Sequence, residues 1–297
     1  MRLRSLDPPF GAHALSAPRE ALRRLAGAMP ENRLGRIGVS LIRKLATGGA
    51  PGPFDVEVFP SIRARLYPTS NRCEKRAVAG AQLFDPDERA ALRDAFAASA
   101  SSPFVFVDLG ANVGLYSLWM VSTARAMSRE VVVLAVEPDT GTRARLEDNL
   151  AASGTDCVMV ADCAVGEHAG RGAILAHEGN RGEHRVRSAG EDDAGSFEVL
   201  PIHEICARRG IVRIDAMKVD LEGHDEAALR GLFANGPTGL RPDFIVVEAG
   251  KEKALPGVVR ICLDNGYELA RRTRLNALLR RVQTQDADTA GRRDGTA

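Results

Sequence analysis

Residues 103–118 read PFVFVDLGANVGLYSL, and this stretch decides the fold. An apolar run that begins at Phe104 ends in Asp108, and a turn with Gly110 and Gly114 then leads into a helical pattern. Ligands of open α/β sheets bind outside the carboxyl ends of the strands. Glycine lets the backbone turn tightly and approach a ligand closely. We therefore expect a ligand at this turn.

The spacing within the turn separates the nucleotide classes. A dinucleotide fingerprint needs G-x-G-x-x-G, whereas Asn112 stands where its middle glycine would be, and the phosphate-loop pattern is also missing. An acid without a phosphate-specific feature suits a ligand with an amino-acid moiety, whose ammonium group Asp108 would approach. At the end of the next apolar run, Glu137 is placed to accept hydrogen bonds from both hydroxyls of a ribose. This combination favours S-adenosylmethionine over NAD. The alternative for Glu137 is a charge before a helix that begins after Pro138, with Asp139 as its N-cap.

Apolar runs alternate with helical patterns from residue 104 onward. The runs span residues 104–109, 131–136, 158–161, 216–221 and 243–249. Strands that are apolar throughout and separated by helices predict a parallel sheet buried on both faces. Beyond the third run, Asp162 or Cys163 is expected near the adenine edge of the ligand, an ordinary turn being the alternative.

The rest of the chain divides around this sheet. We expect an N-terminal arm and helical extension over residues 1–53, a main domain over 54–283 with an insertion at about 166–205, and a disordered tail over 284–297. The alternation in residues 54–68 predicts a hairpin, and the last two segments before the tail predict an antiparallel pair.

Two helices are expected outside the alternating pattern. Asp85 is the expected N-cap of one, with Glu88 three residues on as in a capping box. The other contains apolar residues at helical spacing beside basic ones: Leu34, Ile37, Leu41, Ile42 and Leu45. We expect this helix to pack on the domain; a basic amphipathic helix at a membrane surface is the alternative.

Size and charge narrow the function classes. The 297 residues suffice for one α/β domain with an extension, and 40 basic residues against 39 acidic ones imply no broad nucleic-acid footprint. The five cysteines form no C-x-x-C pair, which is typical of a reduced, cytoplasmic protein. No apolar stretch approaches the roughly 20 residues of a membrane span, so no stable membrane insertion is expected.

The fourth strand is followed by an unusual density of ionisable groups. In MKVDLEGHDEAAL, residues 217–229, four such groups alternate: Lys218, Asp220, Glu222 and His224. Methyl transfer to a hydroxyl needs alignment of the acceptor and removal of a proton. Histidine suits proton transfer near neutral pH, and Asp220 or Glu222 would orient His224 or act in its place. The alternative is structural, an ion pair of Lys218 together with a capped helix that starts at residues 224–225. A metal site from Asp220, Glu222 and His224 is a weaker alternative.

Six motifs occur in an order that resembles a known family. They are FVDLGANVGLYSL, VLAVEPD, LEDNL, AVGEHAG, MKVDLEGHDEAALRGL and RPDFIVVEA. Over roughly residues 65–270 the chain resembles the FkbM-type family of S-adenosylmethionine-dependent methyltransferases. The resemblance implies a class I methyltransferase fold, an α/β (Rossmann-like) seven-stranded sheet with a reversed last strand. It implies O-methylation of a sugar, polyketide or other small metabolite, with KVDLEG at the reaction rim. It also implies these cofactor-lining residues: Asp108, Gly110, Asn112, Gly114 and Glu137. We expect Ala111, which lies between Gly110 and Asn112, to line the cofactor as well.

The chain departs from the family pattern at two places. Ile202-His203 stands where a Leu-Asp pair is usual, and Asp225 replaces the usual Glu after EGH. His203 is expected to be a plain surface residue, a substitute base being the alternative. The segment 67–75 resembles the family's pre-domain element, and Asn71, Glu74 and Lys75 are expected beside the acceptor pocket unless they form a solvated turn.

The expected function is therefore an S-adenosylmethionine-dependent O-methyltransferase that acts on a small molecule and binds no nucleic acid. Two alternatives stay open at this point. One is an NAD(P)-dependent oxidoreductase, and the other is a cofactor-binding protein without catalysis. The acceptor and the oligomeric state are not predicted.

Overall fold

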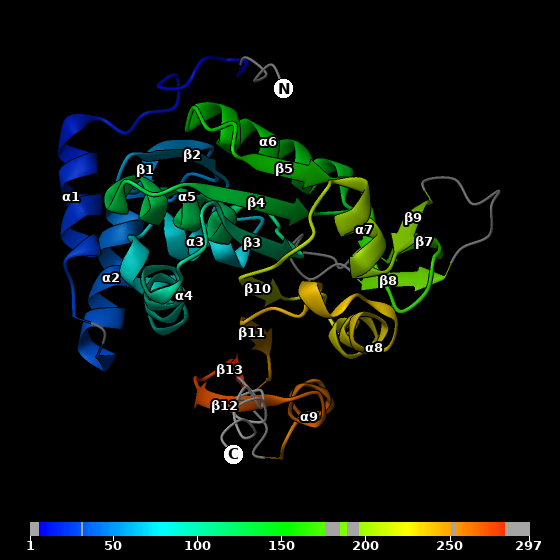
Figure 1. The fold of residues 1–297 in the computed structure, drawn as a ribbon. Helices are drawn as coiled ribbons and strands as arrows, with labels where there is room; N and C mark the ends of the chain where they lie inside the picture. The colour runs from blue at the N-terminus through cyan, green and yellow to red at the C-terminus, as the bar shows by residue number, and fades with distance from the viewer. Residues whose placement is uncertain (1–5, 31, 176–184, 189–195, 251–253, 283–297) are drawn as a thin grey trace, which may run out of the picture.

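The computed structural model describes residues 6–30, 32–175, 185–188, 196–250 and 254–282. Seven strands form its main sheet (Figure 1). Their spatial order is β12 (Tyr267–Arg272), β13 (Asn276–Arg281), β11 (Phe244–Glu248), β10 (Ala216–Val219), β3 (Phe104–Leu109), β4 (Val131–Val136) and β5 (Val158–Ala161). The last five are mutually parallel, whereas β13 runs antiparallel to β11 and to β12. The predicted class I methyltransferase sheet, with its reversed last strand, is confirmed.

The sheet is buried on both faces because its strands are apolar at successive positions. Along β3, Phe104 and Phe106 belong to one hydrophobic core, and Val107 and Leu109 belong to the other. The first core includes residues of α4 (Pro86–Ala98), α5 (Leu115–Met127) and α6 (Thr140–Ala152). The second includes residues of α7 (Ile202–Arg208), α8 (Asp225–Asn235) and α9 (Gly257–Asp264).

The predicted hairpin is formed by β1 (Phe54–Phe59) and β2 (Ile62–Leu66), and it packs beside α5 and α6. Asn149 of α6 fixes its position: the side-chain oxygen accepts from Arg65 N at 2.8 Å, and the side-chain nitrogen donates to Val113 O at 3.0 Å. The hairpin is thereby joined to the loop that follows β3. Two short elements, α3 (Arg72–Ala77) and the 3₁₀ helix η1 (Ala81–Leu83), connect β2 to α4.

Two helices precede the hairpin, α1 (Ala17–Gly27) and α2 (Arg33–Thr47). Val39 and Ala46 are the buried apolar residues of α2, on the side that faces α1 and η1. The expectation that the other apolar positions of α2 pack on the domain is wrong for four of them, which are exposed: Leu34, Ile37, Leu41 and Leu45. Ile42 is partly buried.

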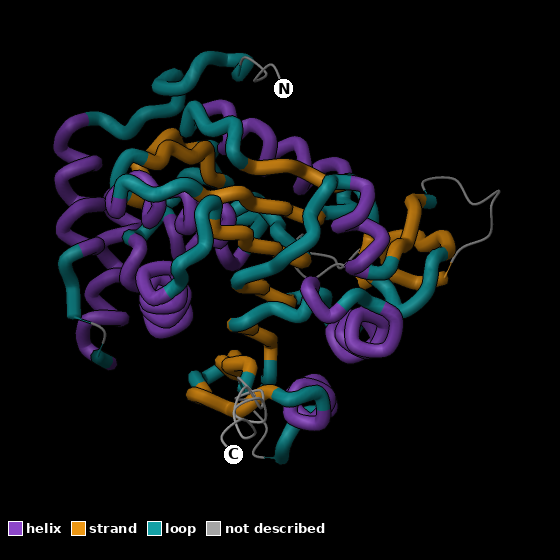
Figure 2. The backbone as a smooth tube through the Cα atoms, in the orientation of Figure 1, coloured by secondary structure: helices purple, strands orange, loops and turns teal. Residues whose placement is uncertain are grey.

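The insertion forms a small second sheet in the order β6-β9-β7-β8, from β6 (Ala164–Val165), β7 (Gly170–Leu175), β8 (Arg185–Ser188) and β9 (Phe197–Leu200). Figure 2 shows these strands apart from the main sheet, on the side to which β3 and β4 point in Figure 1. Parts of the insertion, residues 176–184 and 189–195, and the tail predicted over 284–297 lie outside the described residues.

The predicted capping box at α4 is wrong. Asp85 does occupy the N-cap position, but its backbone is left-handed, with φ 39°, and its side chain makes no capping hydrogen bond. An N-cap side chain reaches the helix from extended backbone, whereas the Asp85 carboxylate accepts from Tyr116 Oη at 3.0 Å and pairs with Arg76. Glu88 accepts from the Asn276 side chain instead of the N-cap amide. Both carboxylates thus bind donors outside the helix instead of the main-chain amides at its N-terminus.

Candidate cofactor and acceptor site

An open cavity lies at the carboxyl ends of β3, β4 and β10. Nine of the twelve residues predicted for the site line it: Asp108, Gly110, Ala111, Asn112, Glu137, Lys218, Asp220, Glu222 and His224. Residues predicted from two distant parts of the chain, 108–137 and 218–224, therefore face one shared space.

The turn at Gly110 packs directly on the carboxyl end of β10. Gly110 N and Ala111 N both donate to Val136 O at 3.0 Å, and Asp220 N donates to Leu109 O at 3.1 Å. Gly110 has φ +74°, and a Cβ at this position would overlap the Asp220 carbonyl oxygen. Glycine is therefore required here for two reasons, the left-handed backbone and the lack of space.

Asp108 is the buried acid of this turn, with 1% of its surface exposed. Its carboxylate accepts from the backbone N of Ser117 at 3.0 Å and from Ser117 Oγ at 2.7 Å. Burial raises the pKa of Asp108 to about 6, although the Ser117 hydroxyl and the charge of Lys218 oppose the shift. A cationic ligand group beside it would hold this carboxyl in its charged form.

Glu137 holds the same turn from the neighbouring strand. One carboxylate oxygen accepts from Asn112 N at 2.9 Å and the other from Asp139 N at 3.0 Å. Burial raises the pKa of Glu137 to about 7, against the effect of these two hydrogen bonds. Asp139 caps α6 as predicted, because its side chain accepts from Thr142 N at 2.7 Å.

Thr142 provides a test of whether the cavity suits a nucleoside. Its hydroxyl is buried, lines the cavity and has no hydrogen-bond partner among the described residues. Buried hydroxyls without a partner are costly, so this one is satisfied when a ligand supplies the partner. The Thr142 hydroxyl and the buried carboxyl groups of Asp108 and Glu137 fit a ligand that carries hydroxyls and an ammonium group. Gly110 lets such a ligand approach the main chain closely.

Lys218 is the buried cation of the site, with 2% of its surface exposed. Its Nζ donates to Asp220 Oδ2 and to Val219 O, both at 3.2 Å, and lies 5.5 Å from the centre of the Tyr116 ring. Burial acts to lower the pKa of Lys218, but the charge and hydrogen bond of Asp220 outweigh it, and the pKa is raised. The lysine is thus charged and neutralises one of the acids at the rim.

The other ionisable groups, which follow β10, lie at the open side of the cavity. The side chain of Asp220 is 40% exposed. Glu222 has a left-handed backbone, with φ 50°, which is uncommon outside glycine. His224 stands at the N-cap position of α8 without a side-chain capping bond. Two features of the structural alternative are present: Lys218 pairs with Asp220, and α8 begins at Asp225, whose carboxylate accepts from Leu221 N and Gly223 N.

The remaining predicted cofactor residues, Gly114, Asp162 and Cys163, are not among the described residues that line the cavity. Gly114 turns the chain into α5 with φ 83° and packs toward Leu146. Ala164 and Val165, two positions after Asp162 and Cys163, do line the cavity. No group of three or more His, Cys, Asp and Glu residues suited to a metal ion occurs in the described part of the chain. His203 lies in α7, away from the described lining.

Sequence reasoning missed the side of the cavity that comes from before β3. Cys73, Phe84 and Asp85 line it together with Tyr116. Burial and the charge of Glu88 raise the pKa of Asp85. Burial, with the charges of Asp220 and Asp85, raises the pKa of the Cys73 thiol to about 12. The resemblance of residues 67–75 to a family element was the one signal that pointed to this side.

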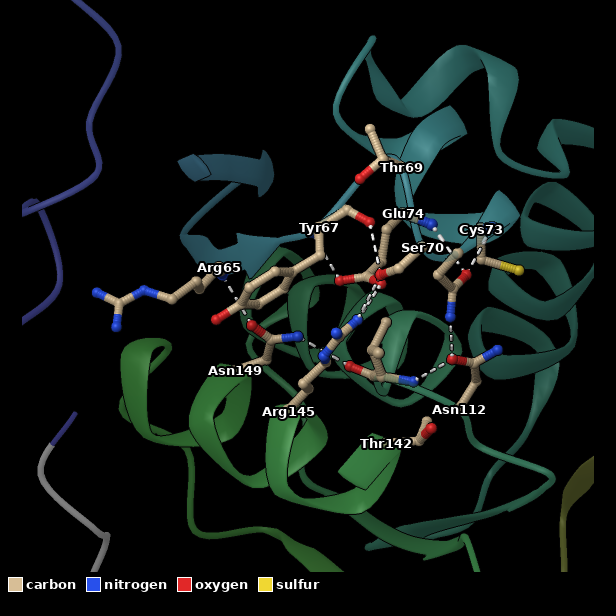
Figure 3. A network of polar contacts seen from close by, with 12 residues as sticks. Arg65, Tyr67, Thr69, Ser70, Cys73, Glu74, Asn112, Thr142, Arg145 and Asn149 are labelled. Atoms are coloured by element: carbon tan, nitrogen blue, oxygen red, sulfur yellow. Dashed lines mark hydrogen bonds and ion pairs between the residues drawn. The ribbon is translucent and has the colours of Figure 1, made fainter. Parts of the chain in front are cut away.

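Within that element, Asn71 and Glu74 are buried, so the solvated-turn alternative is wrong for both. The Asn71 amide donates to Asn112 Oδ1 at 2.7 Å and thereby reaches the turn after β3. Figure 3 shows Glu74 between α3 and α6, where its carboxylate accepts from Tyr67 N at 2.9 Å and pairs with Arg145 at 3.1 Å. Residues 67–75 are thus connected to the turn after β3, residues 110–114, and to α6.

Fold and site together define a class I methyltransferase. The chain belongs to the FkbM methyltransferase family, because the family model described as "Methyltransferase FkbM domain" matches residues 108–269. S-adenosylmethionine is accordingly its cofactor, and the family assignment removes the support for the NAD(P) alternative. No curated protein matches the sequence.

Solved structures with similar folds include three methyltransferases or their relatives. Methyltransferase FkbM from Methylobacillus flagellatus KT is 17% identical with a TM-score of 0.38, over 88% of this chain and 57% of that one. Precorrin-6y C5,15-methyltransferase from Geobacter metallireducens GS-15 is 13% identical with a TM-score of 0.38, over 66% and 94%. Aeropyrum pernix fibrillarin, solved with natively bound S-adenosyl-L-methionine, is 12% identical with a TM-score of 0.38, over 65% and 72%. The chain thus spans little more than half the length of the first of these.

Proposed function

We propose that the protein transfers a methyl group from S-adenosylmethionine to a hydroxyl of a small metabolite or sugar. The observation that carries the proposal is that one cavity is lined both by the buried acids of β3 and β4 and by the ionisable groups after β10. The first set suits the cofactor, and the second suits an acceptor that must lose a proton. In-line methyl transfer requires both in one water-excluding space.

Three residues bind the cofactor in this proposal. Glu137 accepts from the ribose hydroxyls, as acids at this strand position do in related nucleotide sites. Asp108 offers negative charge to the ammonium group of the amino-acid moiety. The Thr142 hydroxyl, for which the described part of the chain offers no hydrogen-bond partner, completes its hydrogen bonding with the nucleoside. When bound, the cofactor supplies a methyl group made electrophilic by its sulfonium.

The acceptor side removes the proton. His224 would accept the proton of the acceptor hydroxyl, whose oxygen would take up the methyl group that the bound cofactor supplies. Lys218 and Asp220 form an ion pair that holds the acceptor oxygen in line. Asp85 and Tyr116, joined by a hydrogen bond of 3.0 Å, form the opposite wall and restrict the acceptor's shape. Glu222 contributes a further acceptor of hydrogen bonds at the rim.

Calorimetric titration with S-adenosylhomocysteine tests the cofactor side. We expect micromolar binding that is lost in Glu137→Ala and kept in Asp162→Asn, since the described cavity lining excludes Asp162. NAD serves as the ligand control and should not bind. Absence of S-adenosylhomocysteine binding would overturn the proposal.

Release of S-adenosylhomocysteine across a panel of hydroxyl, amine and carboxyl acceptors tests the reaction. We expect turnover with hydroxyl compounds, and a large fall in kcat with intact cofactor binding for His224→Ala and Asp220→Asn. Turnover confined to amines or carboxylates contradicts O-methylation. Tight cofactor binding without turnover on any acceptor class supports the non-catalytic alternative instead.

A further inference from the structure

One side of α2 exposes a continuous row of large apolar side chains. Leu34, Ile37, Leu41 and Leu45, here called the α2 stripe, are 80%, 61%, 60% and 57% exposed. Their spacing of three and four residues places them on one side of the helix. The buried residues Val39 and Ala46 occupy another side. The helix is therefore apolar toward the protein and apolar toward the outside.

The α2 stripe stands out from the rest of the described surface. Nine large hydrophobic residues are exposed among the described residues, and five of them lie in α1 and α2, the fifth being Leu25. Single exposed apolar residues are normal on a soluble protein, whereas a contiguous set marks an interaction surface.

Charge identifies the kind of surface that would cover the stripe. Residues 17–48 contain seven basic and two acidic residues, although the whole chain is almost balanced. α2 itself contains four basic residues and no acidic one. Lys44 is exposed and lies three positions after Leu41 and next to Leu45, so its ammonium group flanks the stripe. An apolar row bordered by basic residues fits the interface of an anionic lipid bilayer. A second copy of the same basic surface would be repelled.

We propose that α2 binds the surface of an anionic membrane, with its axis parallel to the bilayer and the α2 stripe in the headgroup region. None of the described helices has the length and apolarity to cross a bilayer, so the proposed attachment is peripheral. The helix would carry the domain with it, because Gln82 Nε2 of η1 donates to Ala26 O of α1 and Arg43 Nη1 of α2 donates to Lys75 O.

Vesicle flotation of the full chain tests the proposal, with phosphatidylcholine vesicles that contain or lack phosphatidylserine. We expect binding to the anionic vesicles only, weakened by added salt. The double variant Leu34→Ser/Leu41→Ser should lower the affinity roughly tenfold or more. Val212→Ser removes an equally exposed apolar side chain, 81% exposed, outside the helices and should leave binding unchanged.

Three results would overturn the proposal. They are no binding to anionic vesicles, equal binding by the double variant, and a stable dimer in light scattering that the double variant dissociates. The last result would assign the α2 stripe to a second copy of the chain. Thermal unfolding of each variant verifies that it is folded. The assay needs neither cofactor nor acceptor, so its outcome is independent of the proposed reaction.

Discussion

The Glu74–Arg145 pair allows a stability prediction with a magnitude. Glu74 is completely buried and Arg145 is 17% exposed, with the guanidinium 4.1 Å from the centre of the Tyr67 ring. Arg145→Met keeps the apolar stem but leaves the carboxylate without its cation. Breaking a buried pair in this way costs about 3–5 kcal/mol. We expect about 3 kcal/mol, the lower end, because the partial exposure of Arg145 lets water reach the vacated side.

Urea unfolding followed by circular dichroism measures this cost. Glu74→Gln should cost less than Arg145→Met, about 1–2 kcal/mol, because the amide oxygen still accepts from Tyr67 N. The double variant should cost less than the two single variants together. Arg93→Met is the control, since the Arg93–Asp94 pair is about half exposed or more and such pairs contribute at most about 1 kcal/mol. A cost for Arg145→Met no larger than for this control would refute the reasoning.

Four further predictions concern the cavity. The affinity for S-adenosylhomocysteine, measured by calorimetry, should rise about tenfold from pH 6 to pH 8, because Glu137, with a pKa of about 7, must be ionised to accept from two hydroxyls. The Glu137→Gln variant should show no such rise. In the free protein the same raised pKa should lower stability as the pH rises from about 4.5 to 7, because the folded state holds the proton longer than the unfolded one. Gly110→Ala should abolish cofactor binding and lower Tm more than Gly154→Ala does, since both positions have positive φ but only the former lacks space for a Cβ. Thr142→Val should raise the stability of the free protein by about 1 kcal/mol while weakening cofactor binding several-fold, whereas Thr155→Val, whose hydroxyl contacts Cys157 Sγ, should lower stability.

The strands of the sheet could be predicted from the sequence because strands buried on both faces consist of consecutive apolar residues. The runs at 104–109 and 131–136 are apolar at every position except Asp108, and the structure has strands with those same bounds. Three residues predicted for the cofactor line the same cavity for a related reason. Asp108, Gly110 and Glu137 lie at strand ends, and the ends of parallel strands meet at one edge of the sheet.

What the sequence could not predict depends on contacts between distant segments. Asp85 has the residue type and position of an N-cap, yet its carboxylate contacts Tyr116, 31 positions away. The periodicity of α2 identifies an apolar helix but not which part of a broad apolar arc is buried. The chain after β5 lines the cavity two residues later than expected, at Ala164, because β5 ends at Ala161 and residues 162 and 163 form the link to β6. Local pattern contains no information on such offsets.

The contact between Gly110 and the end of β10 has a consequence for how this chain could acquire new acceptors. Two segments about 110 positions apart meet there through main-chain atoms: Asp220 N donates to Leu109 O, and the Asp220 carbonyl oxygen fills the space beside Gly110. Side chains at positions 220, 222 and 224 project from this joint without forming it. Substitutions there can change the chemistry of the rim while the cofactor turn keeps its shape. Under the proposed function, this joint separates the turn assigned to the cofactor from the side chains assigned to the acceptor, so that acceptor specificity can change without a change in the cofactor turn.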